Sequence, residues 1–300
     1  MATPAGNENA FLGALVGMAI GDALGLPVLG QSGNEIGDLQ GYLELPDVGE
    51  GEPVKGVISD RTEFALCLVE SLTTNEGRLD PENINARLSY LSESGSRRWM
   101  SETVISSIDE AFEHDGLAPT DKITEAEPSL GVRGIVIGLL HSVRTQNLAD
   151  MYSDATIAAR LTHTDTESAD IVAAVAALTD QAARNVDRDP AWSLPSNAGT
   201  SAISARVVEI GEIVKNADSF EDAVLTVVRA GGDTASYGAI AGGIAGARFG
   251  AAGLPQNLID DLDARIYLSM AAPWFYRTAM QRAGFAIDLR LIQNEFPEMN

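Results

Sequence analysis

Two short segments of this chain bring carboxylate, hydroxyl and guanidinium side chains together. Residues 59–62 (Ser-Asp-Arg-Thr) open one predicted helix, and residues 232–236 (Gly-Asp-Thr-Ala-Ser) open another. A carboxylate there can act as a general base or accept hydrogen bonds from a ligand. Because the first backbone N–H groups of a helix carry positive partial charge, these segments predict a rigid site for a cation, phosphate or hydroxyl ligand.

The same residues also have an ordinary structural use. Ser59 or Asp60 could simply cap the helix that follows, and Asp233 stands where an N-cap belongs. Arg61 has two alternatives: turned inward between Asp60 and Asp233 it supplies positive charge to the site, and turned outward it pairs with an acidic neighbour in solvent. Asp22 interrupts an apolar helix. Because a buried charge needs partners, we predict Asp22 to be a buried hydrogen-bonding support and not a catalytic group.

The elements that must position these residues are helices. Alternation of apolar and polar residues never persists long enough for a sheet, so we predict one all-α domain over residues 1–300. Long loops are expected at 31–58 and 185–200, each with apolar anchors. The predicted helices are 9–23, 61–73, 81–93, 101–114, 131–145, 152–162, 166–184, 201–216, 219–229, 235–249, 256–282 and 285–294.

Two of these helices are rich in small residues. Gly238, Gly242, Gly246 and Gly250 repeat at a spacing of four and therefore lie on one helical face, where another backbone can approach closely. Residues 13–21 show a similar pattern, which convergent tight packing explains without repeat ancestry. We expect both helices to be among the most buried elements.

Composition excludes several classes of protein. With 43 acidic and 20 basic residues the net charge is −23, which argues against non-specific nucleic-acid binding. Cys67 is the single cysteine and lies in an apolar run, so a reducing cytoplasm is the expected location. Asp22 interrupts the apolar residues 11–30, and no basic residue precedes them, which argues against a signal peptide and a membrane span.

Four motifs in order resemble those of the ADP-ribosylglycohydrolase family. Residues 21–25 (Gly-Asp-Ala-Leu-Gly), 59–62, 161–163 (Leu-Thr-His) and 231–236 are similar to its signatures, and residues 133–138 fit its arginine-containing helix more weakly. The resemblance implies an orthogonal helical bundle of about a dozen helices, in which the two small-residue helices pack together. It also implies cleavage of a glycosidic bond to ribose, with two magnesium ions holding the ribose.

The departures from the family pattern fall on the metal ligands. Leu29, Arg61 and Ala235 stand where the family has acidic residues, so only Asp60, Thr62, Asp233 and Ser236 remain as possible ligands. Magnesium needs oxygen donors in octahedral geometry. We therefore predict no cofactor and no magnesium pair. Residues 127–133 replace the family's glycine-rich diphosphate loop, and this puts recognition of a full diphosphate in question.

The sequence predicts a divergent hydrolase acting on an ADP-ribosyl or smaller ribosyl compound, with an ADP-ribosylated protein as a further candidate partner. The alternatives are an inactive relative that binds such a ligand or has a structural or regulatory role, and a different hydrolysis. Asp60 or Asp233 would act as the general base, with Arg61 as an electrostatic anchor. The predicted ligand contacts are Ser59, Arg61, Thr62, Gly131, Arg133, His163, Thr234 and Ser236. A structural role is the alternative for His163, and Arg61→Ala is expected to weaken ligand binding with little loss of stability.

Overall fold

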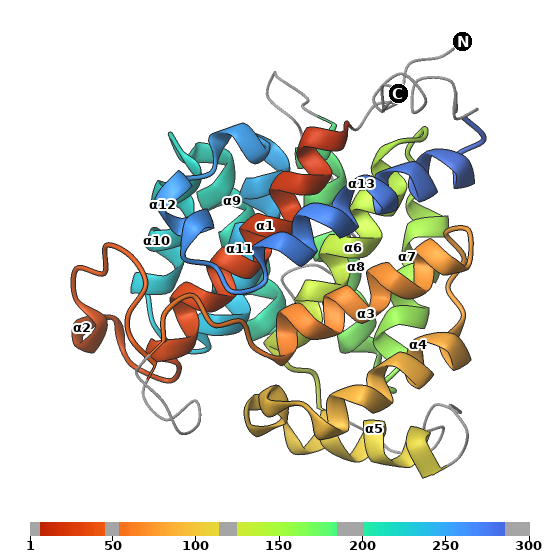
Figure 1. Ribbon diagram of the computed structural model, residues 1–300, viewed down its shortest axis with the longest axis horizontal. Helices are drawn as coiled ribbons and strands as arrows, with labels where there is room; N and C mark the ends of the chain where they lie inside the picture. The colour runs from red at the N-terminus through yellow and green to blue at the C-terminus, as the bar shows by residue number, and fades with distance from the viewer. Residues whose placement is uncertain (1–6, 46–53, 114–124, 185–200, 286–300) are drawn as a thin grey trace, which may run out of the picture.

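The chain folds as a bundle of helices (Figure 1). The computed structural model describes residues 7–45, 54–113, 125–184 and 201–285. Within these ranges the β-pairing consists of two isolated bridges, Ser32–Gly231 and Leu45–Val54. The prediction of an all-α fold is confirmed. The α-helices of these ranges are α1 Glu8–Gly25, α2 Gly33–Ile36, α3 Asp60–Thr74, α4 Pro81–Leu88, α5 Glu102–Glu113, α6 Gly131–Ser142, α7 Leu148–Arg160, α8 Thr166–Ala183, α9 Ala202–Asn216, α10 Phe220–Arg229, α11 Thr234–Phe249, α12 Gln256–Asp260 and α13 Arg265–Arg282.

A few helix boundaries differ from the prediction. The helix expected over 256–282 is two helices, α12 and α13, separated by a turn at residues 261–264. The helix expected over 81–93 ends at Leu88 and continues as a 3-10 turn, Ser89–Glu93. Most of the helix expected at 285–294, and the loop at 185–200, lie outside the described residues.

Helices α1 and α11 run antiparallel and touch along their glycines. A methyl carbon added at Gly21 would lie 1.9 Å from the carbonyl oxygen of Gly238, and one added at Gly242 would lie 2.0 Å from that of Gly17. Only glycine permits backbones to approach this closely. The expectation that these two helices are among the most buried is confirmed, since most of their residues are buried.

The apolar character of α1 reflects this packing. Residues Glu8–Val28 are long and apolar enough to cross a membrane, and 89% of their most apolar window is buried inside the protein. The aromatic ring of Phe11 also packs against Phe275 of α13, with ring centroids 5.4 Å apart.

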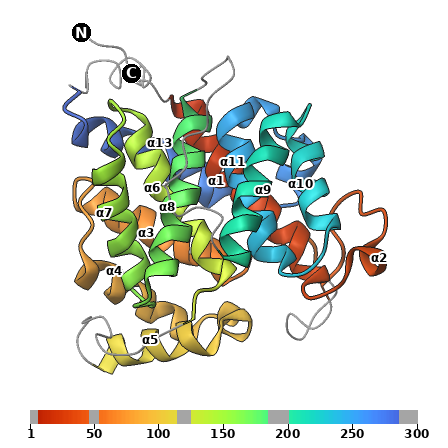
Figure 2. The same ribbon diagram turned by 180° about the vertical axis from the view of Figure 1, so that it is seen from behind.

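The remaining helices surround the α1–α11 pair. Helices α6, α7 and α8 lie on one side of it and α9 and α10 on the other (Figure 2). Gly134 and Gly138 allow α6 to approach the backbone of α8, since an added methyl carbon would lie within 2.5 Å of carbonyl oxygens on α8. The buried apolar side chains of these helices belong to one cluster. This close packing gives the site a rigid base.

Candidate functional site

The C-terminal part of α1 holds the starts of α3 and α11 together. Asp22 accepts hydrogen bonds from the backbone N–H of Ser59 (2.9 Å) and from its hydroxyl (2.7 Å). Three residues later the carbonyl of Gly25 accepts a hydrogen bond from the Thr234 hydroxyl (2.7 Å). The first turns of α3 and α11 therefore meet at the end of α1, although about 170 residues separate them in the chain.

Both helix starts are capped in the ordinary way. Ser59 is the N-cap of α3 and accepts a hydrogen bond from the backbone N–H of Arg61. Asp233 is the N-cap of α11 and accepts one from the N–H of Ser236. Ser59 and Asp233 therefore have the helix-capping role that the sequence suggested. Asp233 caps α11 through Oδ1, so its second carboxylate oxygen can make other contacts.

The Arg61 side chain points inward and joins the two helix starts. Its Nε donates to the Ser236 hydroxyl at 2.7 Å, and its NH1 donates to Oδ1 of Asp60 at 3.0 Å. Its NH2 lies 3.5 Å from Oδ1 of Asp233. Arg61 is only 7% exposed. The alternative in which it turns to solvent is therefore excluded, and the guanidinium occupies the space between the two carboxylates.

Asp22 is a buried support, as the sequence predicted. Its carboxylate also accepts a hydrogen bond from the Thr62 hydroxyl at 2.7 Å. Burial raises the pKa of Asp22, while the charge of Arg61 and the hydrogen bonds from Thr62 and Ser59 oppose this. Thr62 and Thr234 are fully buried, and their hydroxyls bind α1. A ligand contact from either threonine would require it to give up this bond.

Asp60 is the titratable group of the site. Burial raises its pKa to about 7, against the lowering effect of Arg61, and the charges of Asp22 and Glu127 add to the rise. A carboxyl group with a pKa near neutrality can both accept and release a proton, which is what a general acid or base requires. Asp60 is 6% exposed, so a proton would reach it from a bound ligand or water molecule.

Replacing Asp60 with asparagine is expected to make stability less dependent on pH. The folded state binds the Asp60 proton more tightly than the unfolded chain does, because the pKa is about 7 and not the ordinary 3.8. The wild type therefore loses stability as pH rises from about 4 through 7. Asparagine does not titrate, so the free energy of unfolding of D60N relative to wild type should increase by about 3 kcal/mol between pH 5 and pH 8. Urea unfolding at both pH values measures this change.

The same substitution at Asp109 provides the control. A hydrogen bond from Arg97 holds the pKa of Asp109 below its ordinary value, so its charge stabilises the folded state as pH rises. The stability of D109N relative to wild type should therefore not increase between pH 5 and pH 8. An equal increase in both variants would contradict the role assigned to Asp60.

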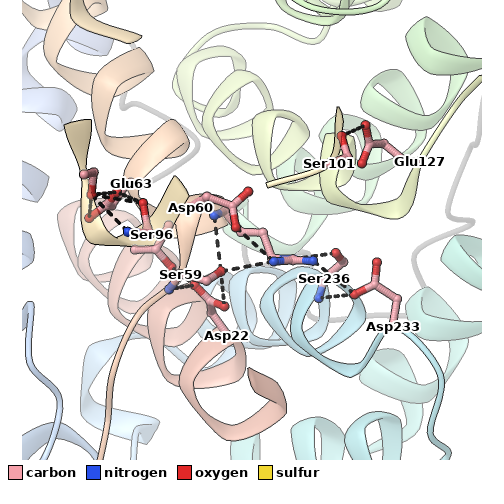
Figure 3. A network of polar contacts seen from close by, with 12 residues as sticks. Asp22, Ser59, Asp60, Glu63, Ser96, Ser101, Glu127, Asp233 and Ser236 are labelled. Atoms are coloured by element: carbon pink, nitrogen blue, oxygen red, sulfur yellow. Dashed lines mark hydrogen bonds and ion pairs between the residues drawn. The ribbon is translucent and has the colours of Figure 1, made fainter. Parts of the chain in front are cut away.

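A third segment, before α6, brings Glu127 to the site. Figure 3 shows Asp60, Glu127 and Asp233 on three different elements. The Glu127 carboxylate accepts a hydrogen bond from Ser101 at 2.7 Å and lies 2.9 Å from Nε2 of His163. Sequence analysis assigned no role to Glu127 or Ser101. The one signal for Glu127 was its place in the segment that replaces the family's diphosphate loop.

His163 supports Glu127 from a buried position. It is 0% exposed, and its Nδ1 lies 2.8 Å from the Thr162 hydroxyl. The imidazole contacts Glu127, and the carboxylate of Glu127 lies between it and the rest of the site. The predicted ligand contact of His163 is therefore indirect in the structure, which favours the structural alternative.

Arg133 and Gly131 have packing roles. The Arg133 guanidinium donates to the carbonyls of Ala158 (2.9 Å) and Ala159 (3.2 Å) at the end of α7, and it lies 4.0 Å from the centre of the Phe64 ring. A side chain at Gly131 would collide with Ile240, so this glycine allows α6 to approach α11. A ligand contact from Arg133 would require it to release the end of α7.

The donor set does not fit a magnesium pair. The guanidinium of Arg61 lies between Asp60 and Asp233, and a cation there repels a metal ion. Thr62 is bound to Asp22, and Ala235 is fully buried. Leu29, at the third altered position, is 38% exposed and offers no oxygen ligand from its side chain. Across the described ranges, no three His, Cys, Asp or Glu side chains are grouped so as to hold a metal ion.

The helical fold belongs to a class that is known from solved structures. A chain described as "ADP-ribosylglycohydrolase-related protein complex" superposes with a TM-score of 0.71 at 25% identity, over 91% of this chain and 99% of that one. The family model described as ADP-ribosylglycohydrolase matches residues 3–216 and 195–284. The chain belongs to the ADP-ribosylglycohydrolase family.

Three similar proteins come from bacteria and an archaeon. An ADP-ribosyl-[dinitrogen reductase] glycohydrolase of Rhodospirillum rubrum is 27% identical over 89% of this chain and 94% of its own length. The ADP-ribosylarginine hydrolase Tri1 of Serratia proteamaculans is 28% identical over 88% of this chain and 78% of its own. An uncharacterized protein of Archaeoglobus fulgidus is 28% identical over 91% of this chain and 98% of its own length.

Proposed function

We propose that this protein is a cytoplasmic hydrolase that cleaves the glycosidic bond of an ADP-ribosyl or smaller ribosyl compound without a magnesium pair. The observation that carries the proposal is the Asp60–Arg61–Asp233 arrangement at the meeting point of α3 and α11. It keeps two carboxylates beside each other and replaces metal charge with a guanidinium. Family membership and two relatives named as glycohydrolase and hydrolase support the reaction class.

The residues divide the chemistry between them. Hydrolysis breaks the bond from the anomeric carbon to the leaving group, passes through an oxocarbenium-like state and adds water. Asp60, with its pKa near 7, takes the proton from the attacking water. Asp233 has a side chain that is 26% exposed and accepts hydrogen bonds from the ribose hydroxyls. Arg61 holds both carboxylates in place and stabilises their negative charge.

Ligand binding without turnover is the second candidate function. It is favoured by the contacts of Arg61, which already occupy Oδ1 of Asp60 and the Ser236 hydroxyl. A ligand would then bind through Asp233 and the remaining oxygen of Asp60, with no group free to activate water. With this second function, the protein is a catalytically inactive family member with a binding or regulatory role.

Hydrolysis of ADP-ribosyl-arginine and of smaller N-ribosyl compounds, measured in EDTA and in magnesium, tests the proposal. We expect turnover that is equal in both conditions, because no step depends on a metal. Asp60→Asn should lower kcat at least about 100-fold, the usual contribution of a general base. Asp233→Asn should weaken substrate binding and so raise KM, whereas Asp109→Asn should leave both constants unchanged. Turnover that requires magnesium would contradict the proposal. Binding by calorimetry with no turnover of any compound would favour the second function.

A further inference from the structure

Glu127 is held in place by polar contacts from two other elements. Ser101, just before α5, donates a hydrogen bond to its carboxylate at 2.7 Å. His163, between α7 and α8, lies 2.9 Å from the same oxygen atom. The Glu127 side chain is thus anchored through one carboxylate oxygen and is still 22% exposed. A side chain fixed in this way has a defined position relative to a ligand.

The Glu127 carboxylate is negatively charged at neutral pH. Burial alone would raise its pKa, but the hydrogen bonds from His163 and Ser101 hold the pKa below its ordinary value. Its charge reaches the centre of the site. Burial is the main cause of the raised pKa of Asp60, and the charge of Glu127 adds to it. Burial would lower the pKa of Arg61, but Asp60, Asp233 and, more weakly, Glu127 raise it.

Two cations of the described residues, Arg61 and Arg133, lie near the site, and both are already bound to other groups. Arg61 is 7% exposed and is bonded to Asp60 and Ser236. Arg133 is 2% exposed and is bonded to the end of α7. Of the charged side chains that the structure describes at the site, Asp233 at 26% and Glu127 at 22% are more exposed than these two arginines. A ligand that enters the site therefore meets negative charge first.

We infer that Glu127 is a specificity-determining residue that makes the site favour neutral or cationic ribosyl compounds over phosphorylated ones. This inference rests on the proposed function and narrows its substrate class to the smaller ribosyl compounds. A phosphate group beside Glu127 would bring two like charges into a partly buried region, where the effective dielectric constant is low and repulsion is strong. A hydroxyl or cationic group in the same place can donate a hydrogen bond to the carboxylate.

Two matched pairs of compounds, which differ only in the 5′-phosphate, test the inference. They are adenosine with AMP, and nicotinamide riboside with nicotinamide mononucleotide. In isothermal calorimetry the wild type should bind each unphosphorylated compound about tenfold more tightly than its phosphorylated partner. Glu127→Gln keeps the shape and removes the charge, so it should bring the ratio of the two dissociation constants close to one. Glu127→Asp keeps the charge and should keep most of the discrimination.

Glu63→Gln is the matched control. Glu63 is also a carboxylate that accepts hydrogen bonds from two serine hydroxyls, those of Ser94 and Ser96, and Figure 3 shows it apart from Asp233. This variant should discriminate as the wild type does. A wild-type ratio near one, or an unchanged ratio in Glu127→Gln, would overturn the inference and leave the proposed function standing. If none of the four compounds binds wild type or Glu127→Gln, both proteins being folded by thermal melting, the inference is overturned. Hydrolysis of ADP-ribosyl-arginine then decides the proposed function separately.

Discussion

Gly21→Ala is expected to destabilise the protein by about 3 kcal/mol, because it forces the two central helices apart. The added methyl carbon would lie 1.9 Å from the carbonyl oxygen of Gly238 and 2.5 Å from its carbonyl carbon. Both atoms belong to the backbone, so no side-chain rotation relieves the collision. Helix α11 would have to move away from α1, and chemical denaturation measures the cost as a lower midpoint.

The same change should also disrupt the site. Asp22 and Gly25, which hold Ser59 and Thr234, follow Gly21 within one helical turn. Gly95→Ala is the matched control, since a methyl carbon there meets nothing within 4 Å. It should change the denaturation midpoint little. A Gly21→Ala variant that unfolds at the same midpoint as Gly95→Ala would contradict the close contact of α1 and α11.

Arg61→Ala is expected to cost about 3 kcal/mol of folding stability at pH 8 and to weaken the binding of a ribosyl ligand. Removing one partner of a buried ion pair leaves the other charge uncompensated. Here that partner is Asp60, and the Ser236 hydroxyl also loses its donor. The sequence alone predicted little loss of stability. That expectation does not fit a side chain that is 7% exposed and bonded to both helix starts.

The pH dependence of the stability lost in Arg61→Ala identifies its cause. Below its pKa of about 7, Asp60 is protonated and no longer needs a cation, so Arg61→Ala should cost less at pH 5 than at pH 8. Urea unfolding at the two pH values measures the difference. Arg144→Ala, which removes a partly exposed pair with Asp150 and a contact to His141, should cost about 1 kcal/mol or less at both pH values. A cost for Arg61→Ala as small as that would show that Arg61 is dispensable to the fold.

Loss of ligand affinity is the second part of this prediction. Arg61 holds Asp60 and Asp233 in position, and a hydrogen bond from a ligand to such a charged group is typically worth about 1.5–3 kcal/mol. A calorimetric screen with ADP-ribose, ribose phosphates and nucleosides should therefore show binding that is weaker by about this amount in Arg61→Ala. Arg144→Ala should bind as the wild type does. Equal affinity in wild type and Arg61→Ala would mean that Arg61 serves structure alone.

Local patterns in the sequence were sufficient for the helices and for the identity of the polar groups. Apolar periodicity predicted most of the helices, because a helix buries one face at a fixed spacing of residues. The glycines of α1 and α11 predicted close backbone contact for the same reason. The role of Asp22 followed from a single fact, a charge in an apolar helix, since burial of a charge demands partners.

The sequence by itself therefore determined which helices form and which side chains stand at their starts, since these depend on residues within a few positions of each other. Only the tertiary structure decided which way those side chains turn. Arg61 turns inward because Asp60 and Asp233 meet across the α3–α11 junction, Arg133 turns to the end of α7, and Glu127 reaches the site through Ser101 and His163. These contacts join residues that are far apart in the chain. Their geometry depends on how whole helices pack, which no local pattern encodes.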